Sequence, residues 1–237
     1  MIYRRISVVI PAFNEANGLP SCLIALKRQT YPRDMFDIIV VDNNSTDDTK
    51  EVAEKFGATV LFEKEQGYVF AVNRGLLEAK GDILVVTDAD TRTSVDWLEK
   101  LNNVYNDKRV VGVTGSVYPD LKSVRTRVVL GVFYDALLMI NFSLGKAHMT
   151  GSNMSVRRDA FHEINGLDIR YRISADVDLG LRLQSVGKVR FVPGIRVYSS
   201  LRRWKKKPMA TLGEYTKAYF LTVWFRKPPG FQLKIVR

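Results

Sequence analysis

The sequence predicts an α/β protein with a mostly parallel central sheet and helices on both faces. Short apolar runs rich in β-branched residues alternate with helix-like segments, at the spacing typical of strand–helix–strand units. No Gly-x-Gly-x-x-Gly follows the first run and no Walker sequence occurs, so the dinucleotide-binding and P-loop classes lack their fingerprints. At 237 residues the chain is long enough for one large domain of this class.

The first 62 residues supply three of the expected strands. Residues 6–10 (ISVVI) form a buried strand, and a helix over 19–29 follows the turn at Asn17-Gly18. The second strand covers 37–41 (DIIVV). Ser45 or Thr46 is expected to cap the next helix, which stops at Gly57, and a short third strand covers 58–62.

The next segment repeats the alternation. A helix is expected over 67–79, ending before Gly81. The apolar run 83–86 is too short for a helix and reads as a buried strand. A helix over 94–106 and a strand over 110–117 complete the expected elements of this part of the chain.

Acidic and amide side chains follow the carboxyl ends of three of these strands. Asn14 and Glu15 follow the first strand, Asp42 the second, and Asp88 and Asp90 the fourth. Ligands bind at this edge of open α/β sheets. Two carboxylates this close repel each other unless a cation lies between them, and oxygen ligands favour hard ions such as Mg²⁺ or Mn²⁺. Helix capping would explain one such cluster, but three on one edge favour a site.

The net charge of +11 is concentrated near the end of the chain. Residues 196–237 hold eleven Lys or Arg and one acid, whereas the preceding residues are almost neutral. Such a segment favours anionic lipid or nucleic acid, and a solvated basic surface is the alternative. We expect a catalytic domain over 1–200 and a basic, aromatic C-terminal extension over 201–237.

The extension has apolar and aromatic residues at helical spacing after Pro208, beside several cations. This pattern predicts an amphipathic helix in a membrane interface, and packing on the catalytic body is the alternative. We expect a peripheral protein at the cytoplasmic face of the cell membrane. The longest apolar run, 128–144, is interrupted by Asp135 and Asn141. It is shorter than the ~18–20 residues that span a bilayer, so a core helix is expected there.

An ordered set of motifs resembles the inverting family 2 glycosyltransferases with the type A nucleotide-diphospho-sugar transferase fold. The similarity runs from Ser7 to about Val192, and its pieces are VVIPAFNE (8–15), VVDNNSTDDT (40–49), NRG (73–75), TDADT (87–91), GSNMSVRRDAF (151–161), GLD (166–168) and ADVDLGLRL (175–183). Each motif is weak alone, and the ordered set is specific.

The resemblance implies a donor site for a nucleotide diphosphate sugar, linked to UDP or GDP. Donor-binding roles fall on Pro11, Ala12, Asn14, Glu15, Asp42, Arg74, Asp88, Asp90, Arg203 and Trp204. Asp88 and Asp90 are the implied ligands of Mn²⁺ or Mg²⁺, and such an ion neutralises charge on the leaving diphosphate. For Arg74, an exposed helix arginine is an equal alternative. Arg203 and Trp204 either cover the diphosphate or acceptor, or simply begin a basic run.

The resemblance also implies an inverting transfer with a carboxylate general base that opens a helix. The family's Glu-Asp pair reads Ala175-Asp176 here, so Asp176 is the expected base and Asp178, on the same turn, is the runner-up. Many relatives have a histidine downstream of the base that binds the metal. The only histidines here, His148 and His162, precede it.

The expected acceptor is a lipid-linked or glycan hydroxyl or phosphate, near Gly151, Ser152, Asn153 and Trp204. Processive synthases carry Gln-x-x-Arg-Trp, and Ser200 replaces the glutamine here, so transfer of a single sugar is expected. Two other classes stay open: a non-enzymatic membrane- or nucleic-acid-binding protein that uses the basic tail, and a nucleotidyltransferase. The first leaves the acidic clusters unexplained, and no recognised nucleic-acid motif occurs. The second would need a Gly-rich loop after the first strand.

Overall fold

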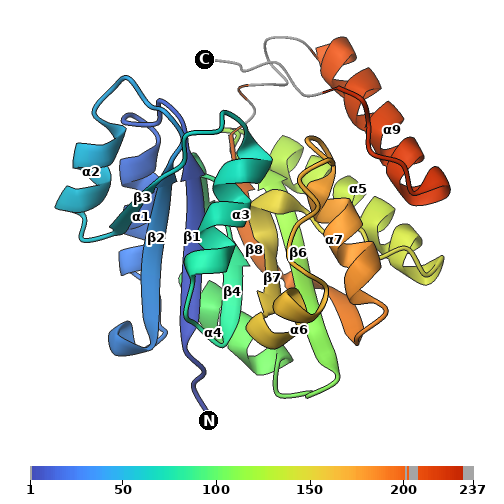
Figure 1. Ribbon diagram of the computed structural model, residues 1–237, viewed down its shortest axis with the longest axis horizontal. Coiled ribbons are helices and arrows are strands. Elements are labelled where there is room, and N and C mark those ends of the chain that lie inside the picture. The colour runs from blue at the N-terminus through green and yellow to red at the C-terminus, as the bar shows by residue number, and fades with distance from the viewer. Residues whose placement is uncertain (1, 201, 203–207, 232–237) are drawn as a thin grey trace.

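The computed structural model describes residues 2–200, 202 and 208–231, and these residues form an eight-stranded sheet covered by helices (Figure 1). Its strands are β1 (Ile6–Ala12), β2 (Phe36–Asp42), β3 (Thr59–Phe62), β4 (Ile83–Val86), β5 (Thr91–Thr93), β6 (Val110–Pro119), β7 (Met154–Arg157) and β8 (Lys188–Ser199). They lie in the order β3-β2-β1-β4-β7-β6-β8-β5.

The α-helices are α1 (Leu19–Lys27), α2 (Thr49–Lys55), α3 (Tyr68–Glu78), α4 (Trp97–Val104), α5 (Val124–Ser143), α6 (Arg158–Glu163), α7 (Ala175–Leu183) and α9 (Pro208–Phe225). Two 3₁₀ turns, η1 (Arg33–Met35) and η2 (Gly151–Asn153), connect them to the strands. Every element expected between residues 6 and 119 is present, with ends that differ by up to three residues.

Parallel pairing dominates the sheet, as expected from the alternating strands and helices. β1 pairs in parallel with β2 and β4, β2 with β3, and β6 with β8. β7 is antiparallel to both of its neighbours, and β5 is antiparallel to β8. Because Ala12 of β1 lies opposite Asp42 of β2, the segments after β1, β2 and β4 emerge at one edge of the sheet.

Both faces of the sheet are buried. Along β1, Val8 and Ile10 pack toward α1 and α4, whereas Val9 packs toward α3 on the opposite face. Successive strand side chains point to opposite faces, so a strand covered on both sides is apolar throughout. This explains the continuous apolar runs in β1, β2 and β4. Helices α1, α2 and α4 cover one face, and α3, α6 and α7 cover the other.

Helix α3 approaches the sheet closely because it carries a glycine at the contact. A Cβ at Gly75 would lie 2.3 Å from Val9 Cγ1 and 2.8 Å from Val41 Cγ2. Any side chain at position 75 would therefore push the helix away from β1 and β2. The close contact fixes the position of the first turn of α3, which reaches the edge where the acidic segments emerge.

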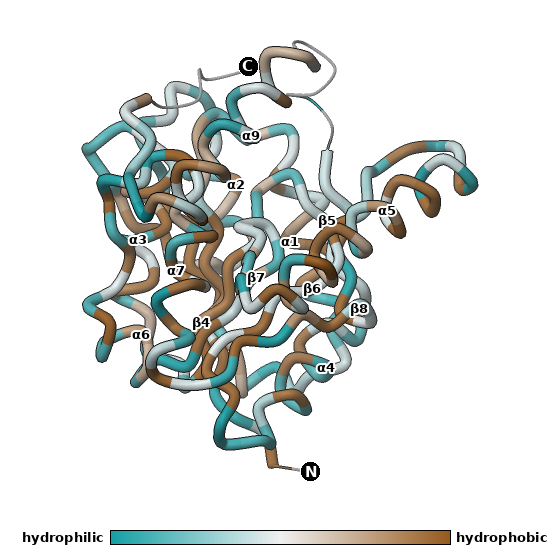
Figure 2. The backbone as a smooth tube through the Cα atoms, turned by 90° about the vertical axis from the view of Figure 1, so that its right-hand side faces the viewer, coloured by the Kyte–Doolittle hydropathy of each residue, from teal (hydrophilic) through white to brown (hydrophobic). Residues whose placement is uncertain are grey.

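Helix α5 corrects one expectation. The helix is present where the apolar run predicted it, but it does not lie in the core, because only Gly131, Asp135 and Leu138 are buried. The helix also begins four residues earlier than the apolar run, at Val124. By length and composition Val124–Ser143 is long and apolar enough to cross a membrane. Figure 2 shows this mostly brown helix at the edge of the molecule.

Helix α9 lies beside α7 and α5 (Figure 1). Val223 packs against Val177 and Leu181 of α7, and the Ser174 and Thr222 hydroxyl oxygens are 2.7 Å apart. Met209, Phe220, Trp224 and Phe225 stay exposed on the other side of α9. The helix therefore packs on the rest of the protein with one side and presents large apolar side chains with the other.

Candidate active site

The segment after β1 is tied to the segment after β2 by its backbone. Asn14 has a positive φ of 54°, and its N–H donates to Ser45 Oγ at 2.9 Å. In return the Asn14 side-chain oxygen accepts from the Thr46 N–H at 2.7 Å. Asn tolerates this left-handed conformation better than most residues. The side chain of Asn14 thus shapes the loop, while Pro11 and Ala12 are buried within β1.

Asp42 is buried at the end of β2 and accepts from the Ser45 N–H at 3.1 Å. The next residue, Asn43, was not predicted as a site residue. Its side chain donates to the carbonyl oxygens of Glu63 and Glu65 and accepts from the Gly67 N–H at 2.7 Å. Asn43 therefore fixes the entry to α3, and the only sequence signal for it was its place beside Asp42.

The acids after β1 and β4 meet on a single arginine. The Arg202 guanidinium donates to Glu15 Oε1 at 2.5 Å and to Asp90 Oδ2 at 2.8 Å. A Cβ at Gly18 would lie 2.8 Å from Glu15 Oε2 and 3.5 Å from Asp90 Cβ. Because residue 18 is a glycine, the residue before α1 leaves room for both acids. Burial raises the pKa of Glu15, and the arginine opposes that shift.

Arg202 was not among the predicted residues, and no local pattern distinguishes it from its neighbours in the basic run. It reaches the acids from 112 positions beyond Asp90. The predicted neighbours Arg203 and Trp204 lie outside the described residues. The Arg202 guanidinium therefore neutralises Glu15 and Asp90, whereas the charge argument from the sequence concerned the pair Asp88 and Asp90.

Asp88 lies deeper than Asp90. Burial and the nearby charge of Asp90 raise the pKa of Asp88 to about 7, while a hydrogen bond from the Tyr68 side chain opposes the shift. Its Oδ1 atom is buried and lacks a hydrogen-bond partner among the described residues. A buried carboxylate oxygen without a partner carries a desolvation penalty. A divalent ion at this oxygen would remove that penalty, so the residues fit the Mg²⁺ or Mn²⁺ that the D-x-D pair implies.

The protein alone supplies few ligands for such an ion. Within the described part of the chain, no group of three or more His, Cys, Asp or Glu side chains is arranged around one point. Mg²⁺ usually keeps several waters and binds through one or two carboxylates together with substrate phosphates. Asp88 and Asp90 therefore fit a metal that is completed by a diphosphate, rather than a metal held by protein alone.

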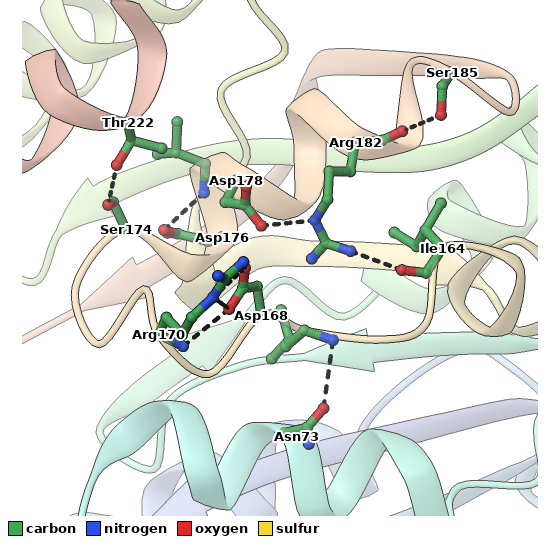
Figure 3. Close-up of polar contacts among 12 residues, drawn as sticks. Asn73, Ile164, Asp168, Arg170, Ser174, Asp176, Asp178, Arg182, Ser185 and Thr222 are labelled. Carbon is green, nitrogen blue, oxygen red and sulfur yellow. Dashed lines mark hydrogen bonds and ion pairs between the residues drawn. The ribbon is translucent and has the colours of Figure 1, made fainter. Parts of the chain in front are cut away.

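Asp176 opens α7 and is held by two backbone amides. Its Oδ2 accepts from the Gly151 N–H at 2.8 Å and its Oδ1 from the Val177 N–H at 2.9 Å. Burial raises the pKa of this carboxyl, and the two amides oppose the shift. Ser174, the residue before α7, has a positive φ of 70°, which few L-residues adopt. Figure 3 shows this start of α7 beside Thr222 of α9.

Asp178 has different surroundings (Figure 3). It is buried, and its Oδ2 accepts from Arg182 Nε at 2.7 Å, one helical turn further along. Arg182 also donates to the Ile164 carbonyl at 2.9 Å, which joins α7 to the end of α6. The carboxylate of Asp178 is thus committed to a structural ion pair. Of the two acids left open by the sequence, Asp176 is the one without a cationic partner among the described residues.

Tyr68 connects the metal side of the site to the base side. Its hydroxyl hydrogen-bonds toward Asp88, and the negative charges of Asp88 and Asp176, together with burial, raise the pKa of that phenol. A Cβ at Gly151 would lie 2.7 Å from the Tyr68 hydroxyl and 3.4 Å from Asp176 Oδ2. Gly151 therefore leaves room where Tyr68 and Asp176 come together. The sequence placed Tyr68 at a helix start but did not identify it as a site residue.

Three predicted residues turn out to have other surroundings. Arg74 pairs with Glu78 at 3.4 Å on the exposed side of α3, and no described contact joins it to the site acids. Asn153 is fully buried: its side chain accepts from Trp97 Nε1 and donates to the Ser116 and Ile195 carbonyls. Both N–H donors of this amide are used and the side chain is fully buried, so Asn153 does not reach an acceptor molecule. Ser152 is also buried, so within η2 only the backbone at Gly151 borders Asp176.

The family model for glycosyl transferase family 2 matches residues 7–164, about two thirds of the chain. The chain belongs to glycosyl transferase family 2. The glycosyltransferase AglE of Haloferax volcanii is 33% identical over 171 residues, which cover 67% of this chain and 54% of that protein. A PGL/p-HBAD biosynthesis glycosyltransferase of Mycobacterium bovis is 30% identical over 185 residues, or 74% of this chain and 68% of that protein.

Solved structures confirm the predicted type A glycosyltransferase fold. The mannosyltransferase PcManGT of Pyrobaculum calidifontis, in complex with GDP-Man and Mn²⁺, superposes with a TM-score of 0.73 at 24% identity, covering 97% of this chain and 67% of that one. TarS of S. aureus in complex with UDP gives a TM-score of 0.67 at 13% identity, covering 91% and 72%. The chain spans about half the length of several family 2 relatives that it matches, including AglE and the probable glycosyltransferase YdaM of Bacillus subtilis.

Proposed function

We propose that this family 2 protein transfers a single sugar from a nucleotide diphosphate sugar, with inversion, to a hydroxyl or phosphate acceptor. The observation that supports it best is the convergence of Asp88, Tyr68 and Asp176 on one space at the carboxyl edge of the sheet. A carboxylate pair suited to a diphosphate-bound metal and a separate carboxylate without a cationic partner are the two parts that such a transfer needs.

Asp176 is the proposed general base. Held by the amides of Gly151 and Val177, its carboxylate would take the proton of the acceptor hydroxyl as that oxygen attacks the anomeric carbon. The pKa raised by burial makes it a stronger base than an exposed aspartate. Attack from the face opposite the leaving diphosphate inverts the configuration, by analogy with glycoside hydrolysis.

Asp88 and Asp90 are the proposed ligands of Mn²⁺ or Mg²⁺. When bound, such an ion would neutralise the charge that develops on the leaving nucleoside diphosphate. The Arg202 guanidinium pairs with both Asp90 and Glu15, so we infer that Arg202 and the metal compete for Asp90.

The donor and acceptor are proposed only as classes. The PcManGT complex holds GDP-Man and a TarS complex holds UDP-GlcNAc, so both GDP- and UDP-linked sugars are compatible with the fold. Pro11, Ala12, Asn14, Glu15 and Asp42 are proposed to line the base and ribose pocket. We propose a lipid-linked or glycan acceptor, reached at the cytoplasmic face of the cell membrane.

The two other classes have less support. Family membership argues against a protein that only binds an anionic surface, and the segment after β1 lacks the Gly-rich loop of a nucleotidyltransferase. A panel of UDP- and GDP-sugars with Mn²⁺ or Mg²⁺ tests the proposal through nucleoside diphosphate release and the anomeric configuration of the product. Release that needs neither metal nor Asp176, or a product with retained configuration, would contradict it.

A further inference from the structure

Helix α5 is built the opposite way round from a helix on the surface of a water-soluble domain. Its side toward the protein carries Arg127, Tyr134, Asp135 and Asn141, whereas its exposed side is almost entirely apolar. A helix on a wet surface normally buries its apolar stripe and exposes its charges. The outward face of α5 consists of Val124, Val128, Val129, Leu130, Val132, Phe133, Leu137, Met139, Ile140 and Leu144.

The exposure of this face is large and continuous. Its ten side chains are between 43% and 63% exposed, and every exposed residue from Val128 to Ile140 is apolar. Single exposed apolar residues are ordinary, but a contiguous patch of this kind marks a surface that another phase or molecule covers. Figure 2 shows α5 at the edge of the molecule.

The inner side of α5 is tied to the protein by polar contacts. Ser116 Oγ donates to Asp135 Oδ2 at 2.9 Å, and the hydroxyls of Tyr134 and Thr150 are 3.0 Å apart. A Cβ at Gly131 would lie 2.4 Å from the Tyr118 ring, so the helix rests closely on β6. A helix that spanned a bilayer would lose these contacts and would expose Asp135 to hydrocarbon. The geometry therefore favours a helix that lies along a surface.

The charges around α5 select the kind of surface. Between Leu121 and Lys146 the chain has four basic residues and one acid, and that acid, Asp135, faces the protein. Lys122 and Arg125 are exposed before and in the first turn of α5, and Lys146 follows its last turn. Lys146 lies over the ring of Trp224 at 5.4 Å, so the C-terminal ends of α5 and α9 are adjacent. Cations that flank an apolar face, beside an exposed tryptophan, complement an anionic lipid headgroup layer.

We propose that the outward face of α5 inserts into the surface of an anionic lipid bilayer, with α5 parallel to the membrane plane. The inner side of α5 then lies toward the active site. Tyr134 contacts Thr150, the residue before Gly151, and the Gly151 N–H binds the Asp176 carboxylate. The membrane would therefore lie one helix away from the proposed base. This position suits an acceptor that is carried by a lipid. That point rests on the proposed function, whereas the insertion of α5 into a bilayer does not depend on it.

Cosedimentation of the full chain with vesicles tests the insertion without any nucleotide sugar. Wild-type protein should pellet with vesicles of phosphatidylcholine and phosphatidylglycerol. The triple variant V129S/F133S/I140S changes exposed side chains along one line of α5, and it should lower the partition coefficient at least about tenfold. The matched control F62S/L77S/I169S replaces three equally exposed apolar residues elsewhere, and it should stay within about twofold of wild type.

Salt and oligomeric state separate the alternatives. At about 1 M NaCl, where the Debye length is roughly 3 Å, part of the wild-type binding should persist because the inserted side chains are apolar. Equal pelleting of wild type and triple variant would overturn the proposal. A second copy of the chain covering α5 would also overturn it. In that case light scattering would show a wild-type dimer that does not pellet with vesicles, and the triple variant would be a monomer. If the triple variant fails to fold, F133S alone gives the same comparison, with at least about a threefold decrease expected.

Discussion

Replacing Asp176 by Asn separates the chemistry of this residue from its structural role. In the wild-type protein the Gly151 N–H donates to the Asp176 carboxylate at 2.8 Å. The Asn side-chain oxygen can accept the same hydrogen bond, so the start of α7 should keep its shape. Burial raises the pKa of Asp176, which means that folding disfavours its charged form. Removing that charge at neutral pH relieves the desolvation penalty, whereas the Asn NH₂ group leaves the Val177 N–H without its acceptor, so the free energy of unfolding should stay within about 1 kcal/mol of wild type.

Turnover should respond very differently. A positioned general base typically contributes about 10²- to 10⁴-fold, which equals about 2.7–5.4 kcal/mol in the activation free energy. We expect Asp176→Asn to lower kcat by that factor, while the KM for the donor stays within about threefold because the lost group acts on the acceptor proton. Nucleoside diphosphate release at saturating donor and Mn²⁺ measures kcat, and thermal unfolding measures stability.

Asp178→Asn is the matched control on the same helix. Its carboxylate accepts from Arg182 Nε at 2.7 Å, and loss of that charge leaves a half-buried guanidinium without its anion. We expect about 1–3 kcal/mol lower stability, a Tm lower by about 2–4 °C per kcal/mol, and kcat within about threefold of wild type. A stable but inactive Asp178→Asn variant beside an active Asp176→Asn variant would refute the assignment of the base.

The pH dependence of kcat gives a second, independent check on Asp176. The base works only when deprotonated, so activity should be lost as the pH falls through its raised pKa, above the ordinary aspartate value of about 3.9. Tyr68 and Tyr134 lie beside it, and the pKa of each phenol is raised, so neither titrates in this range. The pKa of Asp88 is raised to about 7, so the profile is measured at saturating Mn²⁺, which should keep Asp88 deprotonated. The acid limb should persist in Asp178→Asn and should disappear from the residual activity of Asp176→Asn.

Three further predictions concern the metal site and the contact with α9. Asp90→Asn should abolish metal-dependent donor binding, measured by calorimetry with and without EDTA, while circular dichroism stays unchanged; full activity in excess EDTA would contradict it. Arg202→Ala should lower the Mn²⁺ concentration that gives half-maximal donor binding about threefold to tenfold, because the guanidinium no longer competes for Asp90. The control is Arg92→Ala, which removes an exposed ion pair with Asp120 and should leave that Mn²⁺ concentration unchanged. The His148 ring lies 5.2 Å from the ring of Tyr219 on α9, and burial lowers the pKa of His148 to about 4. The neutral ring therefore contributes at most about 3 kcal/mol to stability above pH 6.5, and this contribution is lost as the pH falls toward 4. Thermal unfolding of wild type and His148→Phe across this pH range tests it.

The sheet edge could be predicted because its signals are local. Each of β1, β2 and β4 is a short run of apolar residues, and each is followed directly by a polar segment. Parallel pairing then brings Glu15, Asp42 and Asp88 to one edge without further information. The preference for Asp176 over Asp178 also had a sequence signal that was not used. Arg182 stands four residues after Asp178, the spacing of an ion pair along a helix.

Contacts between distant parts of the chain could not be predicted in this way. Arg202 reaches Glu15 from 187 positions away, and nothing in the basic run singles it out. Asn153 belongs to a motif that resembles an acceptor-binding segment, yet it is buried against Trp97, β6 and β8. The apolar run of α5 predicted a helix correctly. Which side of that helix the protein covers depends on Ser116 and Tyr118 of β6, which the run itself does not reveal.

The helices with exposed apolar faces also hold the segments on either side of the proposed base. Thr222 of α9 is fully buried and contacts Ser174, whose left-handed backbone begins α7 two residues before Asp176. On the other side, Tyr134 of α5 contacts Thr150, directly before the amide that binds Asp176. A strained backbone conformation persists only where surrounding contacts hold it. A change in the packing of α5 would alter the Tyr134–Thr150 contact, and a change in the packing of α9 would alter the Thr222–Ser174 contact. Either change would shift the Asp176 carboxylate, so the position of this carboxylate depends on the surface that covers these two helices.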